Sequence, residues 1–287
     1  MLDVVLDTLV DGVKLLPFLF LTYLAMEYIE HKTTAKTKNT IKKSGKLGPL
    51  VGGILGAFPQ CGFSTAGSNL YAGRVITLGT LISIYLSTSD EMLPVFLSEK
   101  VPMTTILSMI AVKAVIGMVA GFIIDFVIRI RKSSQEQDFT SKIGHMCDHD
   151  HCHCDKSIVK SALNHTLTIF AFILVISFLL NTAVFFVGED SIAGIILDRP
   201  VLGSILSGIV GLIPNCAASV VITQLYVEGV ISIGATMSGL LVGAGAGLIV
   251  LFKENRDIKE NVKIVALLYA IGVACGIIID FILKCTL

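Results

Sequence analysis

Charged residues are scarce in this 287-residue sequence: Asp, Glu, Lys and Arg make up 15% of it, whereas 54% of the residues are hydrophobic. Soluble globular domains carry about 25% charged residues, and a single soluble core of this size could not bury so much apolar surface. The apolar residues also fall in long runs, which are typical of transmembrane helices. The composition therefore excludes a soluble protein and predicts a polytopic membrane protein.

Several other features are missing. The first apolar run lies behind Asp3, Asp7 and Asp11 rather than a basic region, so no cleavable signal is expected. No nucleotide-binding P-loop is present, which argues against ATP hydrolysis within this chain. No nucleophile–base set of an intramembrane enzyme is recognisable, so we do not expect an enzyme. The seven cysteines do not form a disulfide framework, because four lie in apolar segments and three crowd into one polar stretch.

An internal duplication is the strongest pattern in the sequence. The segment FPQCGFS at residues 58–64 reappears as IPNCAAS at 213–219, so that Cys61 and Cys216 are 155 positions apart. The same offset, without a gap, relates GFIIDF at 121–126 to GIIIDF at 276–281. A match that holds register over this distance indicates a tandem duplication. We predict three parts: a first membrane repeat at 2–131, a polar linker at 132–156 and a second membrane repeat at 157–287.

The charges near the span ends predict that the two halves have opposite orientations in the membrane. Residues 31–46 contain six Lys and no acid, whereas the matching loop of the second half has three acids and Arg199 alone. Because basic loops favour the cytoplasmic side, the first loop is predicted inside and the second outside. Arg74 and the basic residues between 253 and 263 are likewise predicted inside.

Short apolar segments between the full spans predict re-entrant hairpins. Full spans are expected at about 10–30, 103–130, 163–187 and 259–283. Residues 47–58 and 61–72 are each about a dozen residues long, which reaches about halfway through a 30 Å hydrocarbon core. Pro59 lacks an N–H group and disfavours helix at the residue before it. We therefore predict a hairpin at 47–72 and its equivalent at 202–227, entering from opposite sides.

The segments that follow the hairpins, 75–98 and 230–252, are predicted to cross the membrane with breaks at equivalent places. The first breaks at residues 87–91, STSDE, and the second at 243–247, GAGAG. Paired, interrupted segments in two inverted halves indicate a transporter site near the bilayer midplane. The predicted fold is an all-α polytopic membrane protein of two inverted-topology repeats, each with a re-entrant helical hairpin and a broken span.

The predicted substrate site combines the hairpin tips with the first break. Helix ends at the tips provide exposed carbonyl and N–H groups. Asp90 and Glu91 lie about midway along their span, where a carboxylate is costly enough to indicate a function. Lys113 is also near mid-depth, and pairing with either acid would offset the cost of burying it. The candidate substrate-binding residues are Pro59, Gln60, Cys61, Ser64, Asp90, Glu91, Lys113, Pro214, Asn215, Cys216 and Ser219.

Structural alternatives accompany these assignments. Small and polar residues at the tips also permit tight helix packing, but packing does not require the same Pro–amide–Cys triplet twice. For Asp90 and Glu91, the alternative is a position displaced toward an external vestibule. Asp125 and Asp280 are duplicated, and inversion would place them near opposite surfaces. We therefore expect helix-end or gate residues there rather than a catalytic pair.

The linker carries a dense group of metal-ligand side chains: His145, Cys147, His149, His151, Cys152, His153 and Cys154. Imidazole and thiolate together suit zinc, copper and similar late transition metals. The spacing is not that of a structural zinc finger, which uses separated ligand pairs. We predict a cytoplasmic, flexible chelating tract. Whether it delivers, senses or buffers metal stays open.

At the PQC and PNC hairpins, the GFIIDF and GIIIDF helices and the His/Cys linker, the sequence resembles a family of bacterial ten-span heavy-metal exporters. These proteins are also called arsenic efflux proteins or manganese transporters. The resemblance covers essentially the whole chain and implies efflux from the cytoplasm. The ten-span label agrees with our count if each half-helix of a hairpin is scored as a segment.

Residues and resemblance together predict a secondary transporter that exports a metal or metalloid ion, such as manganese or arsenite, across the cytoplasmic membrane. Carboxylates and thiols favour a cation, whereas half-helix N-termini and Lys113 suit an oxyanion, so the sign of the charge stays open. The expected partners are the lipid bilayer and the ion, without nucleic acid; a homo-oligomer is one alternative. No cofactor is required beyond a transition metal as substrate or linker ligand. A second hypothesis is a membrane-embedded metal sensor, or an accessory subunit of a transport system.

Overall fold

The computed structural model describes residues 47–57, 61–89, 92–131, 200–214 and 216–286, together with single helical positions in 16–24 and 159–178. The helices of the first half are α3 (Gly48–Gly56), α4 (Cys61–Ala72), α5 (Leu78–Ser87), α6 (Met92–Ser98) and α7 (Met103–Arg131). Those of the second half are α10 (Pro200–Gly211), α11 (Cys216–Val227), α12 (Ile233–Val242), α13 (Ala246–Glu254) and α14 (Ile258–Thr286). No strand occurs among the described residues.

The helices recur in the same order in both halves. The bounds of α4, α5 and α7 reappear 155 positions later as those of α11, α12 and α14. Local hydrogen bonds recur as well. Ser83 Oγ donates to Pro49 O at 2.7 Å, and the equivalent Ser238 Oγ donates to Ser204 O at 2.7 Å. The duplication in the sequence is therefore also a duplication of helix order and of contacts between α3 and α5, and between α10 and α12.

Three helical segments among the described residues are long and apolar enough to cross a membrane. They are Met103–Ile130 in α7, Ile233–Glu254 across α12 and α13, and Ile258–Cys285 in α14. Only 28% of the most apolar window of α7 and of α14 is buried, against 89% for the α12–α13 segment. The fold is therefore that of a polytopic membrane protein in which α7 and α14 present apolar faces outward and the interrupted segments form the interior.

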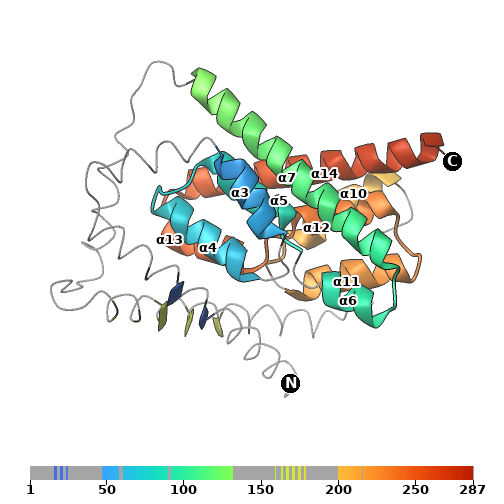
Figure 1. Cartoon of the computed structure of the whole chain (residues 1–287), viewed down its shortest axis with the longest axis horizontal. Coiled ribbons are helices and arrows are strands. Elements are labelled where there is room, and N and C mark those ends of the chain that lie inside the picture. The colour runs from blue at the N-terminus through green and yellow to red at the C-terminus, as the bar shows by residue number, and fades with distance from the viewer. Residues whose placement is uncertain are drawn as a thin grey trace.

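The two halves are interlocked rather than simply adjacent. Within each half, α5 packs between α3 and α7, and α12 packs between α10 and α14. Across the halves, α4 packs against α13, and α11 packs against α6, as Figure 1 shows at two separate places in the molecule. Thus α4 and α11 each contact the short helix that follows the break of the opposite half.

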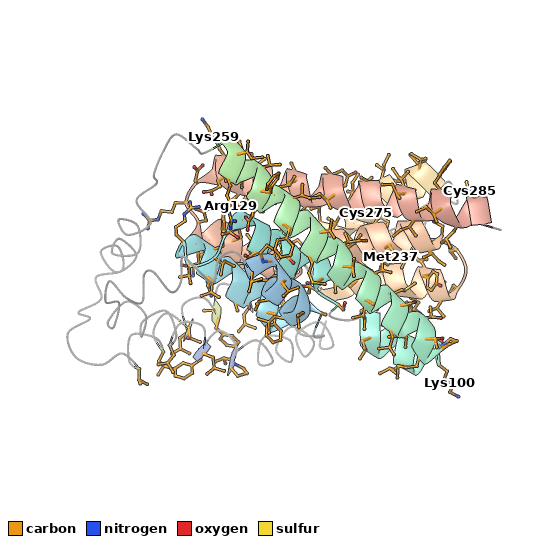
Figure 2. All side chains as sticks on the ribbon, turned by 45° about the horizontal axis from the view of Figure 1, so that its top comes forward. Lys100, Arg129, Met237, Lys259, Cys275 and Cys285 are labelled. Atoms are coloured by element: carbon orange, nitrogen blue, oxygen red, sulfur yellow. The ribbon has the colours of Figure 1, made fainter. Side chains whose placement is uncertain are left out.

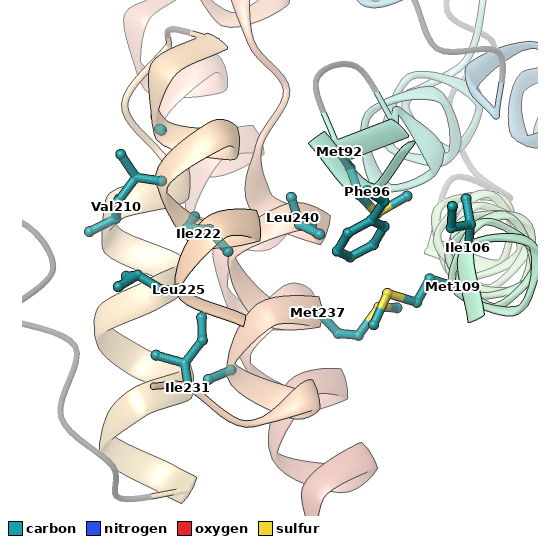
Figure 3. Close-up of a cluster of buried hydrophobic side chains, with 13 residues drawn as sticks. Met92, Phe96, Ile106, Met109, Val210, Ile222, Leu225, Ile231, Met237 and Leu240 are labelled. Carbon is teal, nitrogen blue, oxygen red and sulfur yellow. The ribbon is translucent and has the colours of Figure 1, made fainter. Parts of the chain in front are cut away.

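The hydrophobic core lies at the interface between the halves. One cluster joins Met92, Phe96, Ile106 and Met109 of α6 and α7 to second-half residues, which include Ile222, Met237 and Leu240 (Figure 3). A second cluster joins α4 and α5 residues, such as Tyr71 and Tyr85, to α12, α13 and α14. Burial of these side chains therefore depends on association of both halves.

Close helix contacts require glycine at a few duplicated positions. A Cβ added at Gly79 would lie 2.2 Å from Gly121 O, and one at Gly234 would lie 2.3 Å from Gly276 O. These separations are far below van der Waals contact, so neither position has room for a side chain. Backbones of α5 and α7, and of α12 and α14, approach each other directly at these points.

The predicted helices flanking each tip are present: α3 and α4 occupy the 47–58 and 61–72 segments, and α10 and α11 occupy the 202–213 and 216–227 segments. The predicted breaks are also present, between Ser87 and Met92 and between Val242 and Ala246. The spans predicted at 10–30 and 163–187, and the linker at 132–156, lie largely or wholly outside the described residues.

Candidate substrate site at the helix breaks

The first break follows α5, where buried hydroxyl residues turn back onto the helix end. Ser87, Thr88 and Ser89 are each at most 2% exposed. Thr88 adopts φ −57° and ψ 129°, which ends the helix. The Thr88 hydroxyl donates to Ile84 O at 2.7 Å, and the Ser87 hydroxyl donates to Ser83 O at 2.7 Å. The break is thus stabilised by side-chain hydrogen bonds to carbonyls of the last turn.

The second break follows α12 and is made by glycine instead. Gly243 has ψ 88°, and Gly245 has φ 52° and ψ −141°, a conformation that side chains disfavour. Gly243 N donates to Gly239 O at 3.0 Å, which closes the last turn of α12. The two halves therefore break at equivalent positions by different chemistry, hydroxyl side chains in the first and backbone freedom in the second.

Lys113 connects the two breaks. Its side chain is 1% exposed and projects from α7. The Nζ atom donates to Thr88 O, in the first break, and to Leu240 O at 2.8 Å, in the last turn of α12. Carbonyls at helix C-termini lack intrahelical partners and carry the negative end of the helix dipole. An ammonium group from α7 therefore satisfies carbonyls of two interrupted helices, one from each half.

The first turns of α4 and α11 also approach the second break. Ser64, which is fully buried in α4, lies directly against Gly247: a Cβ at Gly247 would be 2.8 Å from Ser64 Cβ. In α11, Ser219 Oγ would lie 3.5 Å from a Cβ at Gly243. The junction therefore gathers the interrupted helices of both halves, Lys113, and the first turns of α4 and α11.

Ser68 and Tyr85 extend this junction along α4. The Ser68 hydroxyl lies 2.6 Å from Tyr85 OH and 2.7 Å from Gly247 O, and both side chains are fully buried. The equivalents of Ser68 and Tyr85 are Thr223 and Leu240, so this hydrogen-bonded pair occurs in the first half alone. Sequence reasoning missed both residues, although a tyrosine within the apolar run 78–87 is a signal that could have identified one of them.

The predicted site residues separate into three groups. Ser64 and Lys113 are buried at the junction, where Ser219 is half-buried; Pro214 is also half-buried and follows the end of α10. Cys61 and Cys216 are the first residues of α4 and α11. Pro59, Gln60, Asp90, Glu91 and Asn215 lie outside the described residues, as do the linker residues His145, Cys147, His149, His151, Cys152, His153 and Cys154. Among the residues that the structure does describe, no group of three or more His, Cys, Asp or Glu could hold a metal ion.

Asp125 and Asp280 stabilise the starts of α5 and α12. Asp125 accepts from Thr77 Oγ1 at 2.6 Å and from Gly79 N at 2.9 Å. Asp280 accepts from Ser232 Oγ at 2.6 Å and from Gly234 N at 2.8 Å. Both carboxylates are at most 7% exposed. They therefore hold N-caps of the interrupted helices, which agrees with the predicted helix-end role.

A polar cluster that sequence reasoning missed lies away from the breaks. Arg74 Nη1 and Nη2 donate to the two oxygens of Glu260 at 2.7 and 2.6 Å, and Tyr71 OH donates to Glu260 at 2.5 Å. The adjacent Glu260 carboxylate raises the pKa of Arg74. The Arg74 backbone has φ 59°, and its equivalent Gly229 has φ 74°. Both halves thus use the same left-handed turn, whereas the ion pair forms at Arg74, in the first half.

The described residues form helices without strands, and they combine membrane-length apolar helices with a buried polar junction at two helix breaks, which defines a polytopic membrane protein. The chain belongs to the family described as "Putative, 10TM heavy-metal exporter", which matches residues 1–190 and so covers the whole first half. No curated protein and no solved structure matches the chain.

Proposed function

We propose that this protein is a secondary transporter that exports a metal or metalloid ion across the cytoplasmic membrane. The observation that carries the proposal is the position of Lys113, whose buried ammonium joins the Thr88 carbonyl in the first break to the Leu240 carbonyl in the last turn of α12. Buried charge and non-helical backbone at membrane depth are costly, and they are typical of ion pathways. The family of heavy-metal exporters supplies the class of cargo.

The junction is suited to alternating access because it is assembled from both halves. Lys113 and Thr88 belong to the first half, whereas Leu240 and Gly247 belong to the second. A displacement of one half against the other would therefore change the contacts at this point. In transporters with duplicated halves, access to a central site alternates by this kind of motion.

The placement of cations supports an inverted arrangement of the two halves. Arg74 contacts Glu260 at the start of α14, and Figure 2 shows Arg129 near the end of α7 and Lys259 toward the same end of the molecule. Lys100 and Cys285 lie toward the opposite end. We infer that the end with Arg74, Arg129 and Lys259 faces the cytoplasm, since basic residues favour that side. The hairpins α3–α4 and α10–α11 then enter from opposite sides.

The ion is proposed to meet the tips at the starts of α4 and α11, where Cys61 and Cys216 stand at equivalent positions. Their thiols suit arsenite and soft metals, whereas Asp90 and Glu91, directly after the Thr88–Ser89 break, suit a divalent cation such as Mn²⁺. Coupling to an ion gradient accounts for transport without a P-loop. The linker is proposed to collect metal at the cytoplasmic mouth.

Metal accumulation in cells tests the proposal. Cells with and without the protein are loaded with Mn, Zn, Cu, Co or arsenite, and retained metal is measured over time. We expect lower accumulation of at least one ion in cells with the protein, and loss of that difference in Cys61→Ala, Asp90→Asn and Lys113→Met. Ser98→Ala is the matched control, because Ser98 is exposed and bonds only within its own helix turn. Equal accumulation of all five ions, with the protein inserted in the membrane, would contradict the proposal.

A further inference from the structure

The hydroxyl groups at the first break offer oxygen lone pairs rather than hydrogens. Ser87, Thr88 and Ser89 donate to backbone carbonyls at 2.7, 2.7 and 3.1 Å, respectively. A hydroxyl carries a single hydrogen, so each Oγ atom is left as an acceptor. Oxygen acceptors are ligands for cations, and they repel oxyanions.

Lys113 binds the backbone of the same break, through the Thr88 carbonyl. Two of its three N–H bonds are directed at the Thr88 and Leu240 carbonyls. Carbonyls of interrupted helices, at C-terminal ends, are the groups that coordinate coupling cations in transporters with broken spans. The ammonium is therefore held by carbonyl acceptors from both breaks.

The equivalent position in the second half has no such chemistry. Lys113 corresponds to Leu268, which is fully buried in the second hydrophobic cluster with Tyr85. The carbonyl acceptor Leu240 corresponds to Tyr85 itself, whose hydroxyl bonds to Ser68. The duplication thus provides two equivalent positions, one on α7 and one on α14. The position on α7 holds the positively charged Lys113, and the position on α14 holds the apolar Leu268.

We propose that the Lys113 ammonium is a tethered cation in an oxygen-lined cation site, and that the ion handled at this junction is itself a cation that takes these oxygens when the ammonium leaves. This inference rests on the proposed transport function and assigns the sign of the cargo or coupling ion. It disfavours an oxyanion held by Lys113. A cation and the Lys113 ammonium compete for the same carbonyls, so binding of one displaces the other.

Truncation of Lys113 in the purified full-length protein tests the site without any transport measurement. Lys113→Ala removes the ammonium and opens space beside the two carbonyls, whereas Lys113→Met fills that space without charge. Thermal unfolding is followed while methylammonium, K⁺ or Mn²⁺ chloride is added, with choline chloride as the control for ionic strength. We expect methylammonium or a metal cation to raise the Tm of Lys113→Ala by several degrees over choline, and to leave Lys113→Met unchanged.

A second measurement uses the unaltered protein and does not depend on folding of the variants. Lys113 is labelled with an amine-reactive reagent, and the labelled fraction is quantified by mass spectrometry. Mn²⁺ or another transported cation should increase labelling at Lys113 several-fold by displacing the ammonium, whereas sulfate or arsenate should not.

Two results would overturn the inference. One is an equal response of Lys113→Ala and Lys113→Met to every cation, together with cation-independent labelling of Lys113. The other is stabilisation of the unaltered protein by arsenate or sulfate that Lys113→Met abolishes. If either result is found while the protein still exports the ion, the cation site is contradicted and the proposed transport function stands. If cations bind at Lys113 as expected, but cells with and without the protein accumulate the same amount of metal, the proposed transport function is contradicted instead.

Discussion

Arg74 and Glu260 are 186 positions apart in the sequence and form a bidentate ion pair, with N–O distances of 2.7 and 2.6 Å. The pair ties the turn between α4 and α5 to the start of α14, and so joins one half to the other. Their equivalents, Gly229 and Thr105, have no charge, so the pair cannot recur in the symmetric position. Tyr71 also stacks on the guanidinium, whose carbon lies 5.2 Å from the ring centroid.

This ion pair is expected to stabilise the association of the halves. Both side chains are 26% exposed, so solvent screens part of the interaction. Arg74→Gln and Glu260→Gln should each lower the free energy of unfolding, and a double-mutant cycle should give a coupling of about 1–2 kcal/mol. The measurement is thermal or denaturant unfolding in detergent, repeated at high salt, which should weaken the coupling. Strict additivity of the two substitutions would show that the contact contributes nothing.

Asp125 and Asp280 offer an internal comparison, because each accepts from an N-cap hydroxyl and from a glycine N–H. Replacing either by Ala leaves a buried N–H and a half-buried hydroxyl without their acceptor, at an expected cost of about 1–3 kcal/mol. Asn retains one acceptor oxygen and should cost less than Ala at both positions. Unfolding of the four single variants checks this. Markedly different costs for the two Ala variants would contradict equivalent roles.

Gly79 and Gly234 should not tolerate a side chain, because the added Cβ would meet the backbone of the adjacent helix. Gly79→Ala and Gly234→Ala are expected to prevent normal packing of α5 on α7 and of α12 on α14, with a cost of several kcal/mol. Gly229→Ala is the control. Nothing lies within 4 Å of its Cβ position, and only the positive φ is unfavourable, at a cost of about 1 kcal/mol. Yield of folded protein in membranes is the measurement, and equal yields for all three would contradict the argument.

The buried Ser68–Tyr85 contact should contribute to the packing of α4 on α13. Ser68→Ala removes hydrogen bonds to Tyr85 and to Gly247 O and should destabilise by about 1–3 kcal/mol, because the Tyr85 hydroxyl and Gly247 O then keep only their longer mutual hydrogen bond of 3.3 Å. Tyr85→Phe removes the same hydrogen bond from the other side. Ser98→Ala, at an exposed serine that bonds to Val95 O, should change stability by less than about 0.5 kcal/mol. A Ser68→Ala effect no larger than the Ser98→Ala effect would refute this.

The linker can be removed to separate the transporter from the sensor hypothesis. Deletion of 145–155 takes away all seven His and Cys ligands of the linker, so metal bound to the purified protein should fall. Metal content by elemental analysis checks that step. In a transporter, residual export should persist, since the junction around Lys113 is intact. Complete loss of the cellular metal response would favour the sensor.

Helix ends and breaks were predictable because they follow from local chemistry. Proline removes a backbone N–H group, and closely spaced glycines lower helix propensity, so the ends of α10, α11 and α12 near Pro214 and Gly243–Gly245 follow closely from the sequence. The duplication was equally accessible, since it is a property of spacing. In contrast, the sequence suggested carboxylates as partners of Lys113. The structure adds a Leu240 carbonyl from the other half, which no sequence pattern marks, because every residue has one.

The amino-acid sequence by itself determined the membrane class, the two repeats and the positions at which the helices stop, since each depends on hydropathy, periodicity and backbone freedom within a few residues. Only the tertiary structure decided the exchange of α4 and α11 between halves, the Arg74–Glu260 pair and the carbonyls that receive Lys113. These depend on which surfaces meet when two similar units pack together. The surfaces that meet are those of complementary shape, and the residues that form them are distant in the sequence. The Gly247 backbone, which packs against Ser64, is an example.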